Sequence, residues 1–432
     1  MPLFTSDLEL SDDYPTIEPS LKLDFANSRA LDPRITFTRD ASGTYVNKDG
    51  LIKIALENEP RFDHDPITGE SLGLLIEESR TNYQSGNTTS FGVMDIDITQ
   101  GVSTASDVTT APNGLQQAGR ITASGVDEIQ RIGYNTQTTA SGQYNIFSVF
   151  VKKDSGTPIL GFYSNTFVAS NVAFNVDLSD GTTNTINAPA DFVGKVEPFQ
   201  NGWYRVSVMG TGSGNGGSWN INIVSSLTSA RGAQSGSNNA SASYFIWGVQ
   251  EELSTFPFAS SVIPIQKAGS YTRGADLPYI EGTSFSGWYN PEGGAYVLDV
   301  MADSDSGQFF GFGTSSYLES FNVSNSASTQ FYISGNYNTS NAYTGNMNLN
   351  QSNKIGVSFN STGQRVCSNG QSVNGSSFSS GASSLFTDFD RASFGGNIPW
   401  DKNYTNQKRT HVKSFSYYPK YLSDAQLQTL TQ

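Results

Sequence analysis

Short runs in which every second residue is apolar recur along most of this chain, and they restrict it to a β fold. In residues 144–153, for example, Phe147, Val149 and Val151 share one face of an extended strand. Similar runs occur at residues 203–208, 244–251, 296–300 and 355–359. A period of two is the pattern of half-buried antiparallel strands. Turn dipeptides separate the runs, among them Asn113-Gly114, Asp180-Gly181, Asn201-Gly202 and Asn369-Gly370.

The length of 432 residues exceeds what one hydrophobic core usually holds, and roughly two to three domains are expected. Composition changes place the boundaries. We predict, in chain order, an extended arm, a charged leader, a jelly-roll β-sandwich, a linker and a lectin-like β-sandwich, at residues 1–20, 21–83, 84–265, 266–290 and 291–432. The last segment has the size of one domain and is expected to fold alone.

One short helix is expected at the C-terminus, over Ser423 to Leu430. Ser423 is a favourable N-cap, and Gln426 three residues later completes a capping box. Leu422 before the cap and Leu427 inside the helix form a hydrophobic staple. The sequence therefore predicts an all-β protein with a single short helix, and it contains no heptad run that would build a coiled coil.

Composition excludes several partners. The chain has 25 basic and 39 acidic residues, a formal charge of −14, which repels nucleic acid and anionic membranes. Its 27 Phe, 20 Tyr and 5 Trp argue against a disordered chain. No apolar run approaches the ~20 residues of a membrane span, and the first residues do not resemble a signal peptide. The single cysteine, Cys367, is expected to be a buried apolar side chain without a disulfide partner.

The leader at residues 21–83 has the densest charge in the chain. Its arginines Arg34, Arg39, Arg61 and Arg80 can form bidentate pairs with carboxylates, and such pairs fix geometry better than lysine does. We predict that residues 1–83 attach the protein to other subunits, with these arginines making contacts that fix the register. In the alternative interpretation the leader is only the first sheet of the first sandwich and touches no partner.

The leader also resembles a known family. The segments LDFANSRALDPRITFTR, TYV, DGLIK, NEPRFDHDP and GLLIEESRTN, in this order, are similar to a leader found in many virion proteins of tailed bacteriophages. Two lectin-like sandwiches usually follow it in that family. Here the pieces FSVFVKK, NGWYRVSV and YFIWGVQEE resemble a carbohydrate-binding-module jelly roll. The ending KRTHVKSFSYYPKYLSDAQLQTL resembles a laminin-G or concanavalin-A-like fold.

The resemblance implies a virion protein that is made in the cytoplasm of a host bacterium and contacts other virion subunits. It implies a homo-oligomer, with a trimer as the suspected form. We predict a structural tail fibre or tail appendage whose lectin-like domains attach to host-surface polysaccharide. The alternatives are a capsid-decorating or head-fibre protein and, as a different class, a carbohydrate-active enzyme with binding modules.

No catalytic constellation is found in the sequence, and the protein is predicted not to be an enzyme. It contains no G-x-S-x-G, HExxH or phosphate-loop motif. The acidic pairs Glu77-Glu78 and Glu251-Glu252 lie in expected strands, where neighbours point to opposite faces and cannot flank one glycosidic bond. Of the two histidines, His64 is expected in an Asx turn around Asp65-Pro66 rather than in a metal site. His411 is expected to be a packed or solvent-facing strand residue.

Two kinds of ligand remain open. No cofactor and no metal are predicted, with calcium as the alternative because three carboxylate pairs could contribute oxygens: Asp95 with Asp97, Asp303 with Asp305, and Asp388 with Asp390. Glycan binding needs exposed aromatic rings beside amides or carboxylates. The candidates are Trp400, Tyr404, Asp401, Asn403, Tyr337 and Tyr343, with Trp288 and Tyr289 as further aromatics. Each of these aromatics could instead pack against a neighbouring chain or domain.

Overall fold

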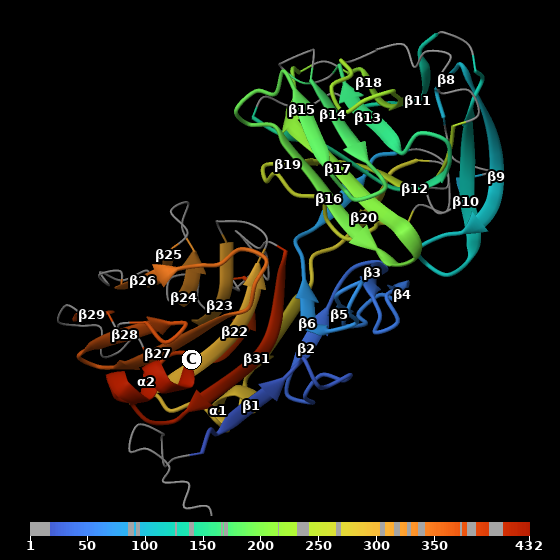
Figure 1. Cartoon of the computed structure of the whole chain (residues 1–432). Coiled ribbons are helices and arrows are strands. Elements are labelled where there is room, and N and C mark those ends of the chain that lie inside the picture. Colours follow the sequence, from blue (N-terminus) through green and yellow to red (C-terminus); the bar gives the residue numbers. More distant parts are fainter. Residues whose placement is uncertain are drawn as a thin grey trace, which may run out of the picture. The chain divides into compact units, whose positions relative to one another are not determined.

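The computed structural model is built almost entirely of antiparallel strands (Figure 1). It divides into two compact units. Unit 1 is Met1–Arg39, Ser71–Glu78 and Ala275–Gln432, and unit 2 is Asp40–Glu70 and Ser79–Gly274. The structure describes residues 18–84, 90–91, 96–125, 128–137, 142–165, 167, 172–214, 216–230, 242–264, 269–302, 307–314, 320–325, 330–335, 342–371, 374–377, 386–396 and 409–432.

Unit 2 contains a sandwich of two six-stranded sheets. The first, called here the pocket sheet, has the order β16 (Val193–Phe199), β17 (Trp203–Thr211), β12 (Tyr144–Ser155), β19 (Ser243–Ser254), β10 (Gln116–Ala123) and β9 (Val102–Thr110). The second has the order β15 (Thr183–Ile186), β14 (Ala173–Asp177), β13 (Ile159–Ser164), β18 (Ser218–Ile223), β11 (Gln130–Asn135) and β8 (Ile98–Gln100).

The core of unit 2 lies between the two sheets. Phe147, Val149 and Val151 all point into it, as their alternation predicts. Trp219 of β18 stacks on Phe147 with ring centroids 5.1 Å apart. The residues between them in the strands, such as Phe150, therefore face the other side of the pocket sheet, where a second apolar cluster forms.

That second cluster lies under the leader segment of unit 2. The leader forms a hairpin of β3 (Gly43–Val46) and β4 (Ile52–Ala55), and β5 (Phe62–His64) lies beside it, with the Val46 amide donating to Asp63 over 2.6 Å. Ile52 of β4 packs with Phe150 and Trp247 of the pocket sheet. A further pair joins β7 (Arg80–Asn82) to β20 (Tyr271–Arg273). The leader thus covers part of the outer face of the pocket sheet.

Unit 1 is also a two-sheet sandwich. One sheet runs β29 (Asn374–Ser377), β28 (Gly363–Ser368), β27 (Asn353–Asn360), β22 (Gly293–Ala302), β31 (Thr410–Tyr418) and β6 (Ser71–Ile76), and β1 (Leu21–Asp24) also pairs with β31. The other runs β2 (Thr36–Thr38), β21 (Leu277–Glu281), β30 (Arg391–Phe394), β23 (Gly307–Gly313), β24 (Ser320–Asn325), β25 (Gln330–Gly335) and β26 (Ala342–Asn346).

Aromatic rings fill the core of unit 1. The ring of Phe310 lies 5.0 Å from that of Tyr296 and 4.6 Å from that of Phe415, centroid to centroid. Aromatic pairs at such distances contribute about 0.5–1.5 kcal/mol each beyond the area they bury. The large aromatic content read from the sequence is therefore core material here.

Leader strands complete the sheets of unit 1. β31 pairs with β22 along one edge, while its other edge pairs with β6 through residues 410–412 and with β1 through residues 414–417. β2 and β21 extend the second sheet beyond β30. Residues 21–83 therefore do not form a separate domain, and residues 266–290 supply strands rather than a bare linker. This pairing argues against the expectation that residues 291–432 fold alone, because four strands come from outside that range.

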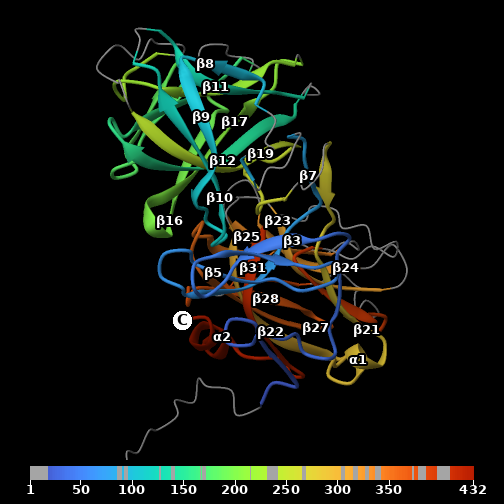
Figure 2. The same cartoon turned by 90° about the vertical axis from the view of Figure 1, so that its right-hand side faces the viewer.

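The predicted C-terminal helix is confirmed as α2 (Asp424–Leu430), with Ser423 as N-cap and both hydrogen bonds of the capping box present. Leu422 and Leu427 are buried in one cluster with Cys367 of β28, against which α2 packs (Figure 2). A second helix, α1 (Thr283–Ser286), has only four residues. The predicted all-β fold, with two antiparallel sandwiches and a short C-terminal helix, is confirmed. Among the described residues no helix has the length and apolarity to cross a membrane.

Candidate ligand pocket

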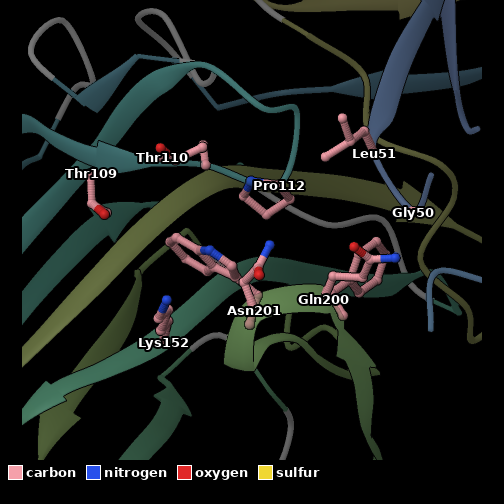
Figure 3. A pocket seen from close by; sticks show the side chains of 11 residues that line it. Gly50, Leu51, Thr109, Thr110, Pro112, Lys152, Gln200 and Asn201 are labelled. Carbon is pink, nitrogen blue, oxygen red and sulfur yellow. The ribbon is translucent and has the colours of Figure 1, made fainter.

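A pocket of about 390 Å³ opens on the outer face of the pocket sheet, the face turned away from the unit 2 core (Figure 3). Three parts of the chain form its walls: strand β9 with the turn after it, the hairpin between β16 and β17, and the leader turn before β4. The lining residues are Gly50, Leu51, Thr109, Thr110, Ala111, Pro112, Lys152, Phe199, Gln200, Asn201 and Trp203.

Strand register sets the floor of the pocket. Phe245 of β19 pairs with both Arg120 of β10 and Lys152 of β12. At the other end Phe199 of β16 pairs with Trp203 of β17. Trp203 lies one step beyond the last paired residues of β12 and β17, beside Lys152. Residues in one register row share a face, so three aromatic and two cationic side chains project together from the outer face of the sheet.

The aromatic floor is firmly supported. Trp203 is only 2% exposed. Phe150 packs edge-on against Phe199 at 4.9 Å and against Trp247 at 5.4 Å. The Arg205 guanidinium lies 5.7 Å from the Phe150 ring centroid. Because these rings pack on each other, the floor has little freedom to collapse into the pocket.

A tight turn carries the polar rim. The hairpin between β16 and β17 passes through the 3-10 turn η2 (Gln200–Gly202), where Asn201 has φ 60° and Gly202 has φ 75°. Asparagine and glycine adopt this left-handed conformation more readily than other residues. The side chains of Asn201 and Lys152 point toward the space below Thr110 and Pro112 (Figure 3). The Asn201-Gly202 turn expected from the sequence thus becomes one wall of the pocket.

The leader turn closes the pocket beside Gln200. The Ile52 amide donates to the Pro112 carbonyl over 3.1 Å, which fixes the leader turn beside the end of β9. Gly50 has φ 72°, and a Cβ there would lie 2.4 Å from Nε2 of Gln200 and 2.5 Å from the Pro66 carbonyl oxygen. Only glycine fits such a close approach at a positive φ. A larger residue at position 50 would therefore collide with both the Gln200 amide and the Pro66 carbonyl.

The charged groups that line the pocket have one sign, which is positive. Lys152 is half-buried, and within the described part of the chain its ammonium makes no hydrogen bond or ion pair. The Gln200 and Asn201 amides are likewise uncommitted among the described residues. No carboxylate is among the lining residues. The pocket therefore offers amide and hydroxyl groups and one positive charge above an aromatic floor.

The predicted glycan residues belong to segments whose side chains lie outside the described part of the structure. Trp400, Asp401, Asn403, Tyr404 and Tyr337 lie outside the described residues. Tyr343 is in β26, where the backbone but not the side chain is described.

The expectation that Trp288 and Tyr289 offer exposed rings for a glycan is wrong. Both are buried, Trp288 against Tyr417 at 4.9 Å between centroids, and the Tyr289 hydroxyl donates to the Phe386 carbonyl over 3.1 Å. They belong to the unit 1 core and form no exposed platform.

The leader arginines pair within the chain. Arg34 forms a bidentate pair with Asp32 two residues earlier, at 2.8 and 2.7 Å, and remains partly exposed. Arg39 is buried and donates to Asp276 over 3.0 Å; the other oxygen of Asp276 accepts the Glu77 amide over 2.9 Å. Arg39 thus holds together separate segments of unit 1.

Arg61 and Arg80 are buried in unit 2. Arg61 donates to the Ser261 hydroxyl over 2.7 Å. Arg80 pairs with Glu252 at 3.4 Å, and its guanidinium lies 4.6 Å from the ring centroid of Phe258. Both arginines fasten the segment that follows β19. A role of the four arginines in virion attachment stays a prediction, and only Arg34 presents its charge near the surface.

The acidic residues and histidines have structural partners. The Ile67 and Thr68 amides donate to the Asp65 carboxylate over 2.9 and 2.7 Å, so the predicted Asx turn is confirmed. His64 contacts the Val46 carbonyl through Nδ1, and His411 is buried in β31. Among the described residues no group of three possible metal ligands occurs. Asp95, Asp303 and Asp305 lie outside those residues, and calcium binding stays an untested alternative.

Glu251 and Glu252 face opposite sides of β19, as predicted. On the outer face, Glu252 accepts a hydrogen bond from the Ser260 amide. On the core face, Glu251 accepts a hydrogen bond from the Asn145 side chain, which itself accepts one from the Trp219 indole. Burial raises the pKa of Glu251 to about 7, although hydrogen bonds from Asn145 and Gln137 favour its charged form. One of its oxygens is buried without a hydrogen-bond donor in the described chain.

Comparison with known proteins adds little. No protein-family model and no curated protein matches the chain. One similar solved structure is the CBM40 domain of Ruminococcus gnavus IT-sialidase bound to α2,3-sialyllactose, with 15% identity over 33% of this chain and 83% of that chain, at a TM-score of 0.28.

Two longer matches are equally distant. The LG1-3 region of the laminin α2 chain has 15% identity over 68% of this chain and 65% of its own, at a TM-score of 0.26. Trypanosoma rangeli sialidase in complex with the inhibitor DANA has 10% identity over 73% and 60%, at 0.28. Scores this low carry no argument about function. The class of this protein, a two-sandwich β protein with a pocket on one outer sheet face, rests on its own strand pairing.

The pocket residues were not among those predicted from the sequence. The Asn201-Gly202 turn and the strands carrying Lys152 and Trp203 were each recognised as local structure. What the sequence did not reveal is that the leader turn at Gly50 and the end of β9 meet them. One signal in the sequence could have indicated the pocket. Lys152 follows Val151, so it lies on the face of the strand opposite the apolar core face.

Proposed function

We propose that this chain is a non-catalytic structural protein of a tailed-phage particle, and that it binds a saccharide in the pocket of unit 2. The observation that carries the binding role is the half-buried ring of Phe199, backed by the buried Trp203, beside the amides of Gln200 and Asn201. Sugar rings present C–H faces that pack on aromatic rings, and their hydroxyls pair with amides. A volume of about 390 Å³ lies within the usual range of ligand pockets.

The particle role rests on the resemblance of the leader to virion proteins of tailed phages. In this proposal residues 1–83 attach the chain to another virion subunit. Three large apolar side chains of the leader support it by their exposure: Ile54 at 49%, Leu56 at 68% and Ile67 at 49%. Exposed apolar side chains gathered on a short segment are typical of surfaces that another protein covers. We place the protein on the tail, as a fibre or appendage that adheres to the host surface.

The absence of catalysis is also part of the proposal. Glycoside hydrolysis needs two carboxyl groups flanking one bond. Glu251 and Glu252 are turned to opposite faces of β19, and each is engaged by buried neighbours. In the described residues, the pocket itself contains no acid that could donate or accept a proton.

Two experiments test the proposal. The full-length protein is applied to an array of carboxylated, sulfated and neutral saccharides, and its strongest hit is titrated calorimetrically. The variant Gln200→Ala/Asn201→Gly removes both amides while glycine keeps the left-handed turn, and we expect about tenfold weaker binding from two lost hydrogen bonds. Unchanged affinity, or no saccharide bound at all, would contradict the binding role.

Location is tested separately on intact particles with gold-labelled antibody against this chain. Label on the tail is expected. Label confined to the head would move the protein to the capsid-decorating alternative, and particles without label would overturn the virion assignment.

A further inference from the structure

We infer that the saccharide taken by the unit 2 pocket is acidic, and that Lys152 binds its anionic group. This inference rests on the proposed function, because it names the ligand class of the same pocket. Its starting point is a contrast in charge. The chain has 39 acidic and 25 basic residues, yet the pocket is lined by one lysine and no carboxylate.

The other cations on this face of the pocket sheet are already engaged. Arg120 pairs with Asp154 at 3.7 Å, and Lys195 pairs with Glu197 at 3.0 Å. Arg205 is buried and donates to the Ser260 carbonyl over 2.7 Å. Among the described cations of the face, Lys152 alone lacks a partner.

The position of Lys152 favours binding at one place. Its stem lies in the register row between Phe245 and Trp203, and aromatic neighbours on both sides limit its rotamers. A Cβ at Gly202 would lie 4.0 Å from Cε of Lys152, so the turn stands beside the end of the side chain. The end of the Lys152 side chain therefore lies at the pocket, beside the Gly202 turn (Figure 3).

This arrangement suits a sugar with a single anionic substituent. An ammonium is a compact point charge, and it can pair with one carboxylate or sulfate group. The Gln200 and Asn201 amides and the Thr110 hydroxyl remain for the ring hydroxyls. Because Lys152 is half-buried, its pairing is screened less by salt than that of a fully exposed lysine.

The test uses full-length protein and three variants. Lys152→Met keeps the length of the side chain without its charge, and Lys152→Arg keeps the charge. Lys153→Met is the matched control, because Lys153 is the next residue, is exposed and does not line the pocket. Each is titrated with the strongest carboxylated and the strongest sulfated saccharide from the array. The methyl ester of the first and the desulfated form of the second serve as neutral counterparts.

We expect Lys152→Met to weaken binding of one acidic saccharide about tenfold and to leave its neutral counterpart unchanged. Lys152→Arg should retain most of the affinity, and Lys153→Met should bind like the wild type. Which acid responds, carboxylate or sulfate, identifies the anionic group.

Equal binding of the acidic and neutral forms by the wild type would overturn the inference while leaving saccharide binding intact. An acidic saccharide bound equally by wild type and Lys152→Met would also overturn it. A protein that binds none of the array saccharides would instead remove the proposed function on which the inference rests.

Discussion

The two units use the leader in different ways. In unit 1, leader strands enter the hydrogen-bond ladder, with β1 and β6 completing the free edge of β31. In unit 2, the leader hairpin β3–β4 pairs with itself and lies over the outer face of a sheet that is already complete. A strand added to a sheet edge continues the sheet, whereas a hairpin laid on a sheet face leaves recesses at its margin. The pocket beside Gly50 and Leu51 is such a recess.

The largest effect that we expect from this difference is on the folding of isolated fragments. Residues 291–432 lack β1, β2, β6 and β21, so we expect no cooperative thermal transition from that fragment. Residues 79–274 contain every strand of the unit 2 sandwich and should melt cooperatively, although removal of the leader uncovers Trp203 and Trp247. Circular dichroism melting of both fragments checks this. Cooperative unfolding of residues 291–432 would break the contrast between the units.

The same reasoning changes how attachment should be tested. Deletion of residues 1–83 removes strands from both units, so loss of incorporation could reflect misfolding. Substitution of the exposed Leu56 and Ile67 by serine leaves every strand in place. If attachment uses this surface, fewer copies should be found on particles while the melting profile remains that of the wild type.

A further prediction concerns the buried carboxyl of unit 2. The Glu251 pKa of about 7 lies above its ordinary value of 4.5, so the folded state holds a proton that the unfolded state has lost. Stability of unit 2 should therefore fall by up to about 3 kcal/mol between pH 4.5 and pH 7, and then level off. Glu251→Gln should remove this slope. Hydrogen exchange of β12 and β19 amides across this pH range measures it, and an equal slope in the variant would assign it to other groups.

A smaller effect is expected from Gly50→Ala. The positive φ alone costs about 1–2 kcal/mol, and the new methyl would collide with the Gln200 amide and the Pro66 carbonyl. We expect weaker saccharide binding by calorimetry. Gly214→Ala is the matched control, because Gly214 also has a positive φ of 82° but a Cβ there meets nothing within 4 Å. The control should lose stability alone; if it also lost affinity, backbone strain rather than the close approach would be responsible.

The smallest effect belongs to unit 1. Ser423→Ala removes the N-cap of α2 and should cost about 1 kcal/mol, seen as faster hydrogen exchange over residues 424–432. Ser423→Asp should retain the cap, since aspartate accepts the same hydrogen bond from Gln426. Unit 2 should be unaffected by either change. Similar exchange in all three proteins would show that burial of Leu427, rather than the cap, holds the helix.

Local features of this protein were determined by the sequence itself. The capping box at Ser423, the Asx turn at Asp65 and the alternation of Phe147, Val149 and Val151 each depend on residues a few positions apart. Their hydrogen bonds and faces follow from backbone geometry, so they could be predicted without knowing the fold. The same holds for the buried thiol of Cys367 and for the opposite faces of Glu251 and Glu252.

Only the tertiary structure decided which distant segments meet. The leader reads as one charged block, but β1 and β6 pair with β31 more than 300 residues later in the chain. Arg39, expected to face another subunit, is buried against Asp276. Lys152 of β12, Gly50 of the turn before β4 and Asn201 of the turn between β16 and β17 meet at one pocket. Which strand pairs with a free edge, and which carboxylate a buried arginine meets, depends on the free energy of the complete fold. Residues that neighbour each other in the sequence do not determine it.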